Sequence, residues 1–325
     1  MDNYLKWSNF TLCNYKKLHN VNIINNKLLI DKMNFDKEQI IKINDIIPNM
    51  SYIKIDKNIL IKNSDIKWVY QEGFLNDLNN LDIEIKIEWN ENIIYLKCYK
   101  NKLIKILNRI IVLIKLINYI NKNNEKIIIF LILTKLKKNY DKNKYILEAK
   151  HINSGYTDTK YKYIFIWREE EFEKVLFHEI IHLLNKDHRN EKYTLDMKNN
   201  HLFYEAITDV KAIYYNIIYL SILSNENINK LMVLELNFMI NQANLMESLI
   251  NTNYICKSPV LSYYIIKTKI FKYLFSDIMN ENIYNDLFIK NVYGNELINN
   301  IYHDKIIKVN YKNFNSTRMT LLELN

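Results

Sequence analysis

Residues 175–184, with the sequence VLFHEIIHLL, constrain the fold of this chain more than any other stretch. They are apolar on every side of a helix except at His178, Glu179 and His182. A helix that is hydrophobic all round has to be buried, so other elements of the chain must surround it. Ionisable side chains in such a place are costly unless they are paired or bind a metal. The segment therefore predicts a buried helix that carries a polar site.

The two histidines have the spacing of metal ligands. His178 and His182 are four residues apart, so their imidazoles project from one face of a helix, one turn apart. Two such imidazoles can bind one zinc ion at about 2.0–2.1 Å. Glu179 follows the first histidine, where its carboxylate can reach a water molecule on the metal. Ordinary residue frequencies would give the bare H-E-x-x-H pattern in roughly one chain of this length in a hundred.

This pattern resembles the signature of zinc metallopeptidases, the zincins. In their gluzincin branch the third ligand is a glutamate on a second helix, with an aspartate one turn further on. Residues 204–210 read YEAITDV and resemble the glutamate helix of thermolysin-like peptidases. The resemblance implies that Glu205 is a zinc ligand and that Asp209 accepts the outer N–H of a ligand histidine. It also implies that Glu179 is the general base that takes a proton from the zinc-activated water.

A second branch, the metzincins, offers a different third ligand. Its pattern, H-E-x-x-H-x-x-G-x-x-H, ends in a histidine, and His188 occupies that position here. Asn185 replaces the glycine, and asparagine is the next best residue for a left-handed turn. Met197 follows near the place of a metzincin Met-turn. A metzincin-type site with His188 is therefore the alternative to Glu205.

Three observations favour Glu205. The EAITD string sets two carboxylates four residues apart inside an amphipathic helix expected at residues 200–223, whereas the metzincin pattern requires one further coincidence. More than a hundred mostly helical residues follow Glu205, as in gluzincins. The segment around Met197, LDMKNN, lacks the hydrophobic turn of metzincins. We therefore expect one catalytic Zn²⁺, held by His178, His182 and Glu205.

Periodicity predicts an α+β fold in three regions. Residues 1–99 form a β-rich N-terminal region that ends in a β-hairpin at residues 81–100. Residues 100–225 form the expected catalytic core, and residues 226–325 form a helical subdomain that completes the cleft. The resemblance implies a zincin-like core with a backing helix, a small mixed sheet with an edge strand, the motif helix and the glutamate helix.

The expected elements of the last two regions follow from their periods. An amphipathic backing helix is expected at residues 101–124, and the motif helix is expected to start with the carboxylates of residues 169–171, which favour a first turn. Strands are expected at residues 126–134, 146–157 and 160–168. Later helices are expected at residues 227–250, 259–279 and 282–302.

The resemblance also implies a group that stabilises the tetrahedral oxyanion, which gluzincins take from a tyrosine or histidine of the helical half. Tyr263 and Tyr264 lie at a suitable distance along the chain. The alternatives are His303 and Tyr214.

Residues 149–157, AKHINSGYT, take the place of the edge strand that pairs with the substrate backbone in this superfamily. We assign Asn153, Ser154 and Gly155 to that edge. Related aminopeptidases carry a glutamate there that binds a free N-terminus, and HINSG contains no acidic residue. This favours an endopeptidase, although Glu148 lies close enough to keep an exopeptidase open.

Composition excludes several other classes. Three glycines in the whole chain leave no place for a dinucleotide-binding loop or a P-loop. Cys13, Cys98 and Cys256 are an odd number without a C-x-x-C pair, which argues against a disulfide scaffold and a zinc finger. The net charge of +9 comes from scattered lysines, typical of an AT-rich genome such as that of a large DNA virus or a protist, so no specific nucleic-acid binding is expected.

The expected partner is a protein or peptide substrate. The N-terminus lacks the apolar region of a secretory signal and no long apolar span follows, so we expect a soluble, intracellular protein without a membrane span. The alternative to an enzyme is a catalytically inactive zincin-fold protein that acts as an interaction module. Glu179 argues against it, because a structural zinc site needs no general base and usually has four protein ligands.

Overall fold

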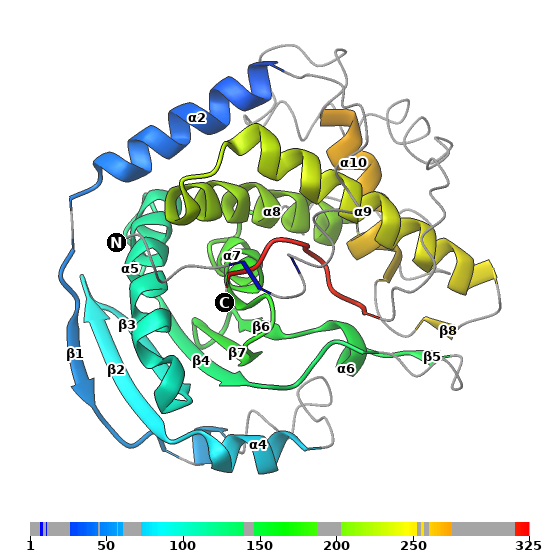
Figure 1. Cartoon of the computed structure of the whole chain (residues 1–325). Coiled ribbons are helices and arrows are strands. Elements are labelled where there is room, and N and C mark those ends of the chain that lie inside the picture. Colours follow the sequence, from blue (N-terminus) through cyan, green and yellow to red (C-terminus); the bar gives the residue numbers. More distant parts are fainter. Residues whose placement is uncertain are drawn as a thin grey trace.

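A computed structural model gives the fold (Figure 1). It describes residues 7–8, 11, 27–44, 46–56, 58–60, 73–139, 146–187, 203–251, 255–256, 260–274 and 316–324. The predicted α+β class is confirmed, because a mixed six-stranded sheet in the N-terminal part is followed by a mostly helical C-terminal half.

The main sheet combines antiparallel and parallel pairs in the order β1-β2-β3-β4-β7-β6. The first three strands are antiparallel, β4 is parallel to both of its neighbours, and β6 is antiparallel to β7 at one edge. The strands are β1 (Asn49–Tyr52), β2 (Ile83–Trp89), β3 (Asn92–Cys98), β4 (Ile128–Thr134), β6 (Gly155–Asp158) and β7 (Tyr163–Arg168).

The predicted hairpin at residues 81–100 is confirmed. Ile83 faces Cys98 in the β2–β3 pair, and the tight turn between the strands is made by Asn90 and Glu91. Both turn residues have positive φ, 42° and 67°, as a two-residue hairpin turn requires. Because β3 also pairs with β4, the strands of residues 49–98 and those of residues 128–168 share one sheet.

Helices cover both faces of the sheet. On one face α5 (Leu103–Ile120), the predicted backing helix, packs with α7 (Phe172–Leu183) and α8 (Phe203–Ser224) in a single large core. On the other face the short α4 (Phe74–Asn80) covers a second cluster built on Phe165 and Trp167. Further helices are α2 (Lys27–Lys42), α6 (Ala149–Ile152), α9 (Ile228–Asn251), the π-helical η3 (Leu261–Ile266) and α10 (Lys267–Leu274), with a 3-10 turn η1 (Lys100–Lys102) before α5.

The motif helix α7 is buried along its whole length of 12 residues, as its apolar sequence predicted. Figure 1 shows it near the centre of the molecule, between the sheet and the helical half. The expected start at residue 169 was wrong, because Glu171 has a left-handed backbone with φ 59° and the helix begins at Phe172. The carboxylates of residues 169–171 bind groups from distant parts of the chain instead, which local sequence could not reveal.

The strand expected at residues 146–157 is interrupted by a short helix. β5 (Ile146–Leu147) pairs with β8 (Ile255–Cys256) in a separate two-stranded sheet, α6 follows, and only β6 joins the main sheet. Glu148 and His151 form a capping box at the start of α6, in which the His151 ring accepts the Glu148 N–H at 3.0 Å. These local side-chain bonds replace the strand ladder over residues 149–152.

The helical half agrees with its periodicity where it is described. α8 and α9 match the helices expected at residues 200–223 and 227–250, and the one expected at 259–279 begins as η3. The helix expected at residues 282–302 lies outside the described residues. α8 is long and apolar enough to cross a membrane, but 78% of the apolar window is buried inside this fold, as in a core helix.

Candidate metal centre

Three side chains converge between α7 and α8. His178 and His182 come from α7 and Glu205 from the first turn of α8. The two Nε2 atoms lie 3.0 Å apart, and Glu205 Oε2 lies 3.2 Å from His178 Nε2 and 3.3 Å from His182 Nε2. Among the residues that the structure describes, no other group of three His, Cys, Asp or Glu side chains converges in this way.

These separations fit a bound zinc ion. A tetrahedral ion about 2.0–2.2 Å from each ligand atom sets the ligand atoms about 3.3–3.6 Å from one another. The observed distances of 3.0 to 3.3 Å need only slight adjustment to reach that geometry. The donor set of two imidazoles and one carboxylate is also the one found in catalytic zinc sites with an open position. The buried triad of His178, His182 and Glu205 could therefore hold a metal ion.

The Nδ1 atom of each histidine contacts a carboxylate on the side of the ring opposite Nε2. His178 Nδ1 lies 3.1 Å from Asp209 Oδ1, the contact that the EAITD string implied. His182 Nδ1 lies 2.6 Å from Asp187 Oδ2, and sequence reasoning did not single out Asp187. Such outer bonds fix the tautomer and the angle of a ligand ring, so that Nε2 faces the metal.

Asp187 reaches His182 because of the way α7 ends. The Asn185 N–H donates to the His182 carbonyl at 3.1 Å and the Lys186 N–H to the Ile181 carbonyl at 2.9 Å, which is a Schellman motif. Asn185 has φ 51°, the left-handed turn expected of it. The turn brings Asp187 back onto the helix, and this reversal is the signal that could have identified it. His188 and Met197 lie outside the described residues.

Charges around the triad are balanced in pairs. Burial by itself would raise the pKa of Glu205, but the two histidines hold it well below its usual range. Burial lowers the pKa of His182, but Glu205 and Asp187 outweigh this and raise it to about 10. The carboxylates therefore favour a positive charge between them. That charge can be carried by protons on the imidazoles or by a metal cation that replaces those protons.

Asp209 has two further partners that the sequence did not suggest. Lys174 from α7 and Lys267 from α10 both pair with its carboxylate, the second at 2.9 Å. Burial would raise the pKa of Asp209, but Lys174, Lys267 and His178 hold it well below its usual range. Asp209 is thus kept ionised although its side chain is 0% exposed to solvent.

Glu179 lies between the triad of His178, His182 and Glu205 and the edge of the sheet. Thr157 Oγ1 from β6 is 2.8 Å from Glu179 Oε2, within hydrogen-bond distance. Gly155 packs so closely on α7 that an added Cβ would lie 2.7 Å from Val175 Cγ1 and 3.3 Å from Glu179 Oε1. The edge strand therefore orients the carboxylate that the motif assigns as general base.

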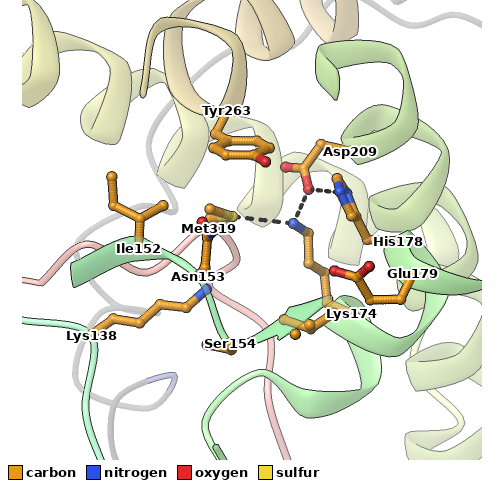
Figure 2. A pocket seen from close by; sticks show the side chains of 12 residues that line it. Lys138, Ile152, Asn153, Ser154, Lys174, His178, Glu179, Asp209, Tyr263 and Met319 are labelled. Carbon is orange, nitrogen blue, oxygen red and sulfur yellow. Dashed lines mark hydrogen bonds and ion pairs between the residues drawn. The ribbon is translucent and has the colours of Figure 1, made fainter. Parts of the chain in front are cut away.

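A small cavity opens beside Glu179 (Figure 2). Its volume is about 40 Å³, and His178, Glu179 and Tyr263 form the wall nearest the ligand triad. All three residues assigned to the substrate edge, Asn153, Ser154 and Gly155, line the same cavity. Glu148 caps α6 and pairs with Lys150 at 2.9 Å.

The two adjacent tyrosines of η3 have different surroundings. The Tyr263 hydroxyl donates to Glu205 Oε2 at 3.2 Å, and its ring lies 5.9 Å from the His178 ring between centroids. The Tyr264 hydroxyl donates instead to the Thr317 carbonyl at 2.6 Å. Of the alternatives, Tyr214 donates to Asp36, and His303 lies outside the described residues.

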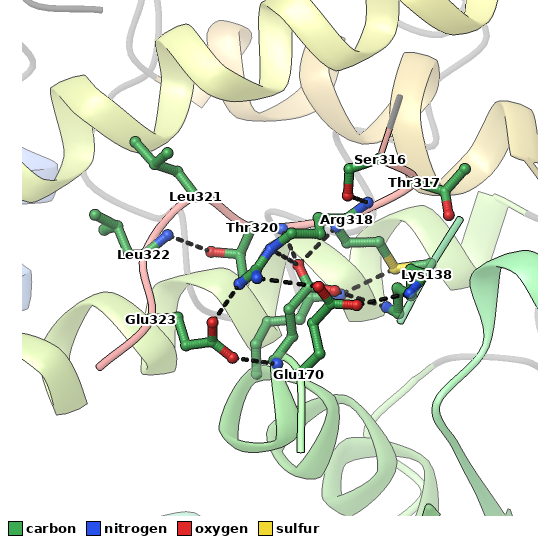
Figure 3. Close-up of polar contacts among 12 residues, drawn as sticks. Lys138, Glu170, Ser316, Thr317, Arg318, Thr320, Leu321, Leu322 and Glu323 are labelled. Atoms are coloured by element: carbon green, nitrogen blue, oxygen red, sulfur yellow. Dashed lines mark hydrogen bonds and ion pairs between the residues drawn. The ribbon is translucent and has the colours of Figure 1, made fainter. Parts of the chain in front are cut away.

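Residues 316–324 run between α7 and the helical half (Figure 3), and Met319 of this segment lines the cavity. Arg318 pairs with Glu170 at 3.2 Å and with Glu323 at 2.9 Å. Glu171 Oε1 accepts the backbone N–H groups of Met319 and Thr320 at 2.7 and 2.6 Å. This segment fixes the turn that precedes α7 and thereby supports the motif helix.

Comparison with known proteins gave no match, whether to a protein-family model, to a curated protein or to a solved structure.

Proposed function

We propose that this protein is a zinc-dependent metallopeptidase with the gluzincin set of ligands, and that it acts as an endopeptidase. The observation that carries the proposal is the convergence of His178, His182 and Glu205 beside Glu179, at a cavity bounded by a sheet edge. The order of the elements along the chain supports it, because a backing helix, the sheet, the motif helix and the glutamate helix follow one another as in a zincin.

A zinc ion bound by this triad would polarise the substrate carbonyl and lower the pKa of a water molecule toward about 7. The protein's own residues supply the rest of the chemistry. Glu179, held by Thr157, accepts the proton of the attacking water and returns it to the leaving amine. Asp209 and Asp187 keep the Nε2 atoms of the histidines aimed at the metal position.

Tyr263 is our candidate for stabilising the oxyanion. Its hydroxyl already lies at Glu205, within reach of the ligand triad, and burial raises the pKa of Tyr263 well above its usual value. It therefore remains a protonated donor at neutral pH, as a developing negative charge on oxygen requires. The Tyr264 hydroxyl is directed away from the ligand triad, toward Thr317.

The edge of the sheet is the proposed site for the substrate backbone. Among the strands that the structure describes, β6 has only β7 as a neighbour in the main sheet, so its outer edge can pair with an extended peptide. Main-chain pairing of this kind tolerates many sequences. It suits cleavage within a chain, and the described edge residues 153–155 include no acidic group for a free N-terminus.

Glu179→Gln tests the proposal, because it keeps the shape of the side chain and removes the base. We expect about one zinc per chain in both proteins and at least a 100-fold slower hydrolysis of an unfolded protein substrate by the variant. Glu38→Gln, an exposed change on α2, is the matched control and should behave as wild type. Bound zinc without any hydrolysis by the wild type would instead identify a noncatalytic protein.

A further inference from the structure

The cavity beside Glu179 contains two buried lysines that the proposed hydrolysis does not use. Lys138 is 1% exposed and Lys174 is 2% exposed, and both line the cavity together with Ser154 (Figure 2). Lysine is almost never buried unless its charge is compensated, so two of them at one small cavity need an explanation.

Hydrogen-bond donors are left over at this cavity. Lys138 Nζ lies 2.7 Å from Glu171 Oε2, an ion pair that occupies at most one of its three N–H bonds. Within the described part of the chain, Ser154 Oγ has no hydrogen-bond partner, and Lys138 Nζ has none beyond its ion pair with Glu171. Ser154 is 2% exposed, so its hydroxyl is also removed from bulk water. Buried donors of this kind are costly until an acceptor reaches them.

The charged groups around the cavity are paired with one another. Three lysines share two carboxylates, since Lys138 pairs with Glu171 while Lys174 and Lys267 both pair with Asp209. The neighbouring carboxylates of Glu170 and Glu323 are paired with Arg318 (Figure 3). Glu235 pairs with backbone N–H groups of residues 321 and 322 and does not line the cavity. Glu179 also lines the cavity, so an entering acceptor would be held by the remaining donors of Lys138 and Ser154 rather than by an excess of positive charge.

The size of the cavity limits what can enter. A volume of about 40 Å³ corresponds to roughly three water-sized groups, since one water needs about 10–15 Å³. A carboxylate has three heavy atoms and matches this size. Ile152 and Met319 form apolar walls that would contact the stem of the entering group.

We propose that this cavity binds a carboxylate of the substrate next to the scissile bond, with Lys138 Nζ and Ser154 Oγ as its donors. The inference rests on the proposed peptidase function and gives it a specificity. The carboxylate could belong to an acidic side chain or to the free C-terminus of a short substrate, and both present the same group. Lys174 contributes positive charge, but its own donors are directed to Asp209 and Met319.

The test starts with the cleavage products of an unfolded protein digest, identified by mass spectrometry. Matched peptides are then made around one site, with Glu, Gln or Leu at each residue that flanks the cut, and with a free or amidated C-terminus. We expect a Glu peptide to be cleaved at least tenfold faster than its Gln counterpart at one of the two positions. A preference for the free acid over the amide alone would place the bound carboxylate at the C-terminus.

Variants connect the preference to the cavity. Lys138→Met and Ser154→Ala should each lower the Glu/Gln ratio toward one, whereas Lys137→Met, whose side chain is 58% exposed, should leave the ratio unchanged. Ser154→Ala is the smaller change and keeps the test valid if Lys138→Met fails to fold. Equal rates for acid and amide peptides in the wild type would overturn the proposal.

A binding measurement separates this inference from the peptidase proposal. Glutamate hydroxamate and glutamine hydroxamate differ only in the side-chain carboxylate, and both can bind zinc through the hydroxamate. Calorimetry on zinc-loaded protein should give at least tenfold tighter binding of the glutamate compound, even if no peptide is cleaved. Equal affinities would overturn the carboxylate site and leave the proposed hydrolysis untouched.

Discussion

His182 Nδ1 and Asp187 Oδ2 are 2.6 Å apart, across the turn that ends α7. Because the aspartate fixes the ring of a proposed zinc ligand, Asp187→Ala should weaken zinc binding by about 10- to 100-fold. A competition titration with a chelator of known affinity measures the change. Asp31→Ala, at an exposed position of α2, serves as the control. Zinc affinity unchanged in Asp187→Ala would mean that the contact does not support the ligand.

The third ligand can be identified by elemental analysis. Glu205 Oε2 lies within 3.3 Å of both Nε2 atoms, so Glu205→Ala should lose bound zinc. His188→Ala should keep about one zinc per chain, because the triad is complete without it. Zinc retained in Glu205→Ala and lost in His188→Ala would assign the third position to the histidine, as in a metzincin.

The neighbouring tyrosines of η3 should respond differently to loss of a hydroxyl. Tyr263→Phe removes the donor that lies at Glu205 and should slow peptide hydrolysis by about 100-fold with zinc retained. Tyr264→Phe removes a bond to the Thr317 carbonyl and should cost about 1 kcal/mol of the free energy of unfolding, with activity close to wild type. Rate measurements and urea unfolding on both variants test this, and equal loss of activity in both would contradict it.

Alanine substitutions at two glycines, Gly155 and Gly73, should also have different effects. At Gly155 a methyl group would lie 2.7 Å from Val175 Cγ1 and 3.2 Å from Glu179 Cγ, so Gly155→Ala should displace Glu179 and reduce hydrolysis while zinc stays bound. At Gly73 there is open space but φ is +89°, so Gly73→Ala should cost roughly 1–2 kcal/mol of stability and leave hydrolysis unchanged. Full activity in Gly155→Ala would show that β6 does not position Glu179.

The buried Glu235 should make stability depend on pH. Burial raises its pKa to about 7, and hydrogen bonds from Thr320 and Leu321 offset this only in part. The folded protein therefore keeps a proton that the unfolded chain releases above its ordinary pKa of 4.5. The stabilisation is complete below pH 4.5 and is lost as the pH rises through about 7, with a slope of at most about 1.4 kcal/mol per pH unit.

Glu235→Gln should flatten this part of the stability curve. Urea unfolding between pH 4.5 and 7.5 measures it, with Glu247→Gln on the same helix as the control. Parallel curves for wild type and Glu235→Gln would show that Glu235 does not titrate in this window.

Helices and strands whose apolar residues repeat with a regular spacing were predictable from the sequence. The hairpin β2–β3, the backing helix α5 and the site helices α7 and α8 all agree with the sequence, because alternation and helical spacing are local properties. The pairing of His178 with His182 followed from their spacing on one helix. The approach of Glu205 to both was inferred from a resemblance, and it is the fold that brings α7 and α8 together.

The errors share a physical cause. The carboxylates of residues 169–171 suit the first turn of a helix, yet Glu171 binds Lys138 and two N–H groups of residues 319 and 320. The sequence of residues 149–152 predicts a strand, but a capping box makes them helical. In each case side-chain bonds, either distant or very local, outweighed the periodic signal.

The sequence by itself determined the helix that must be buried, the polar residues on it and the chemistry that these residues permit, because residue type and spacing are properties of a short segment. The tertiary structure alone decided that Asp187 supports His182, that Tyr263 rather than Tyr264 faces Glu205, and that Lys138 lies at the cavity beside Glu179. These contacts depend on turns, on the orientation of η3 and on residues far apart in the chain. Such relationships exist only once packing has fixed the elements in space.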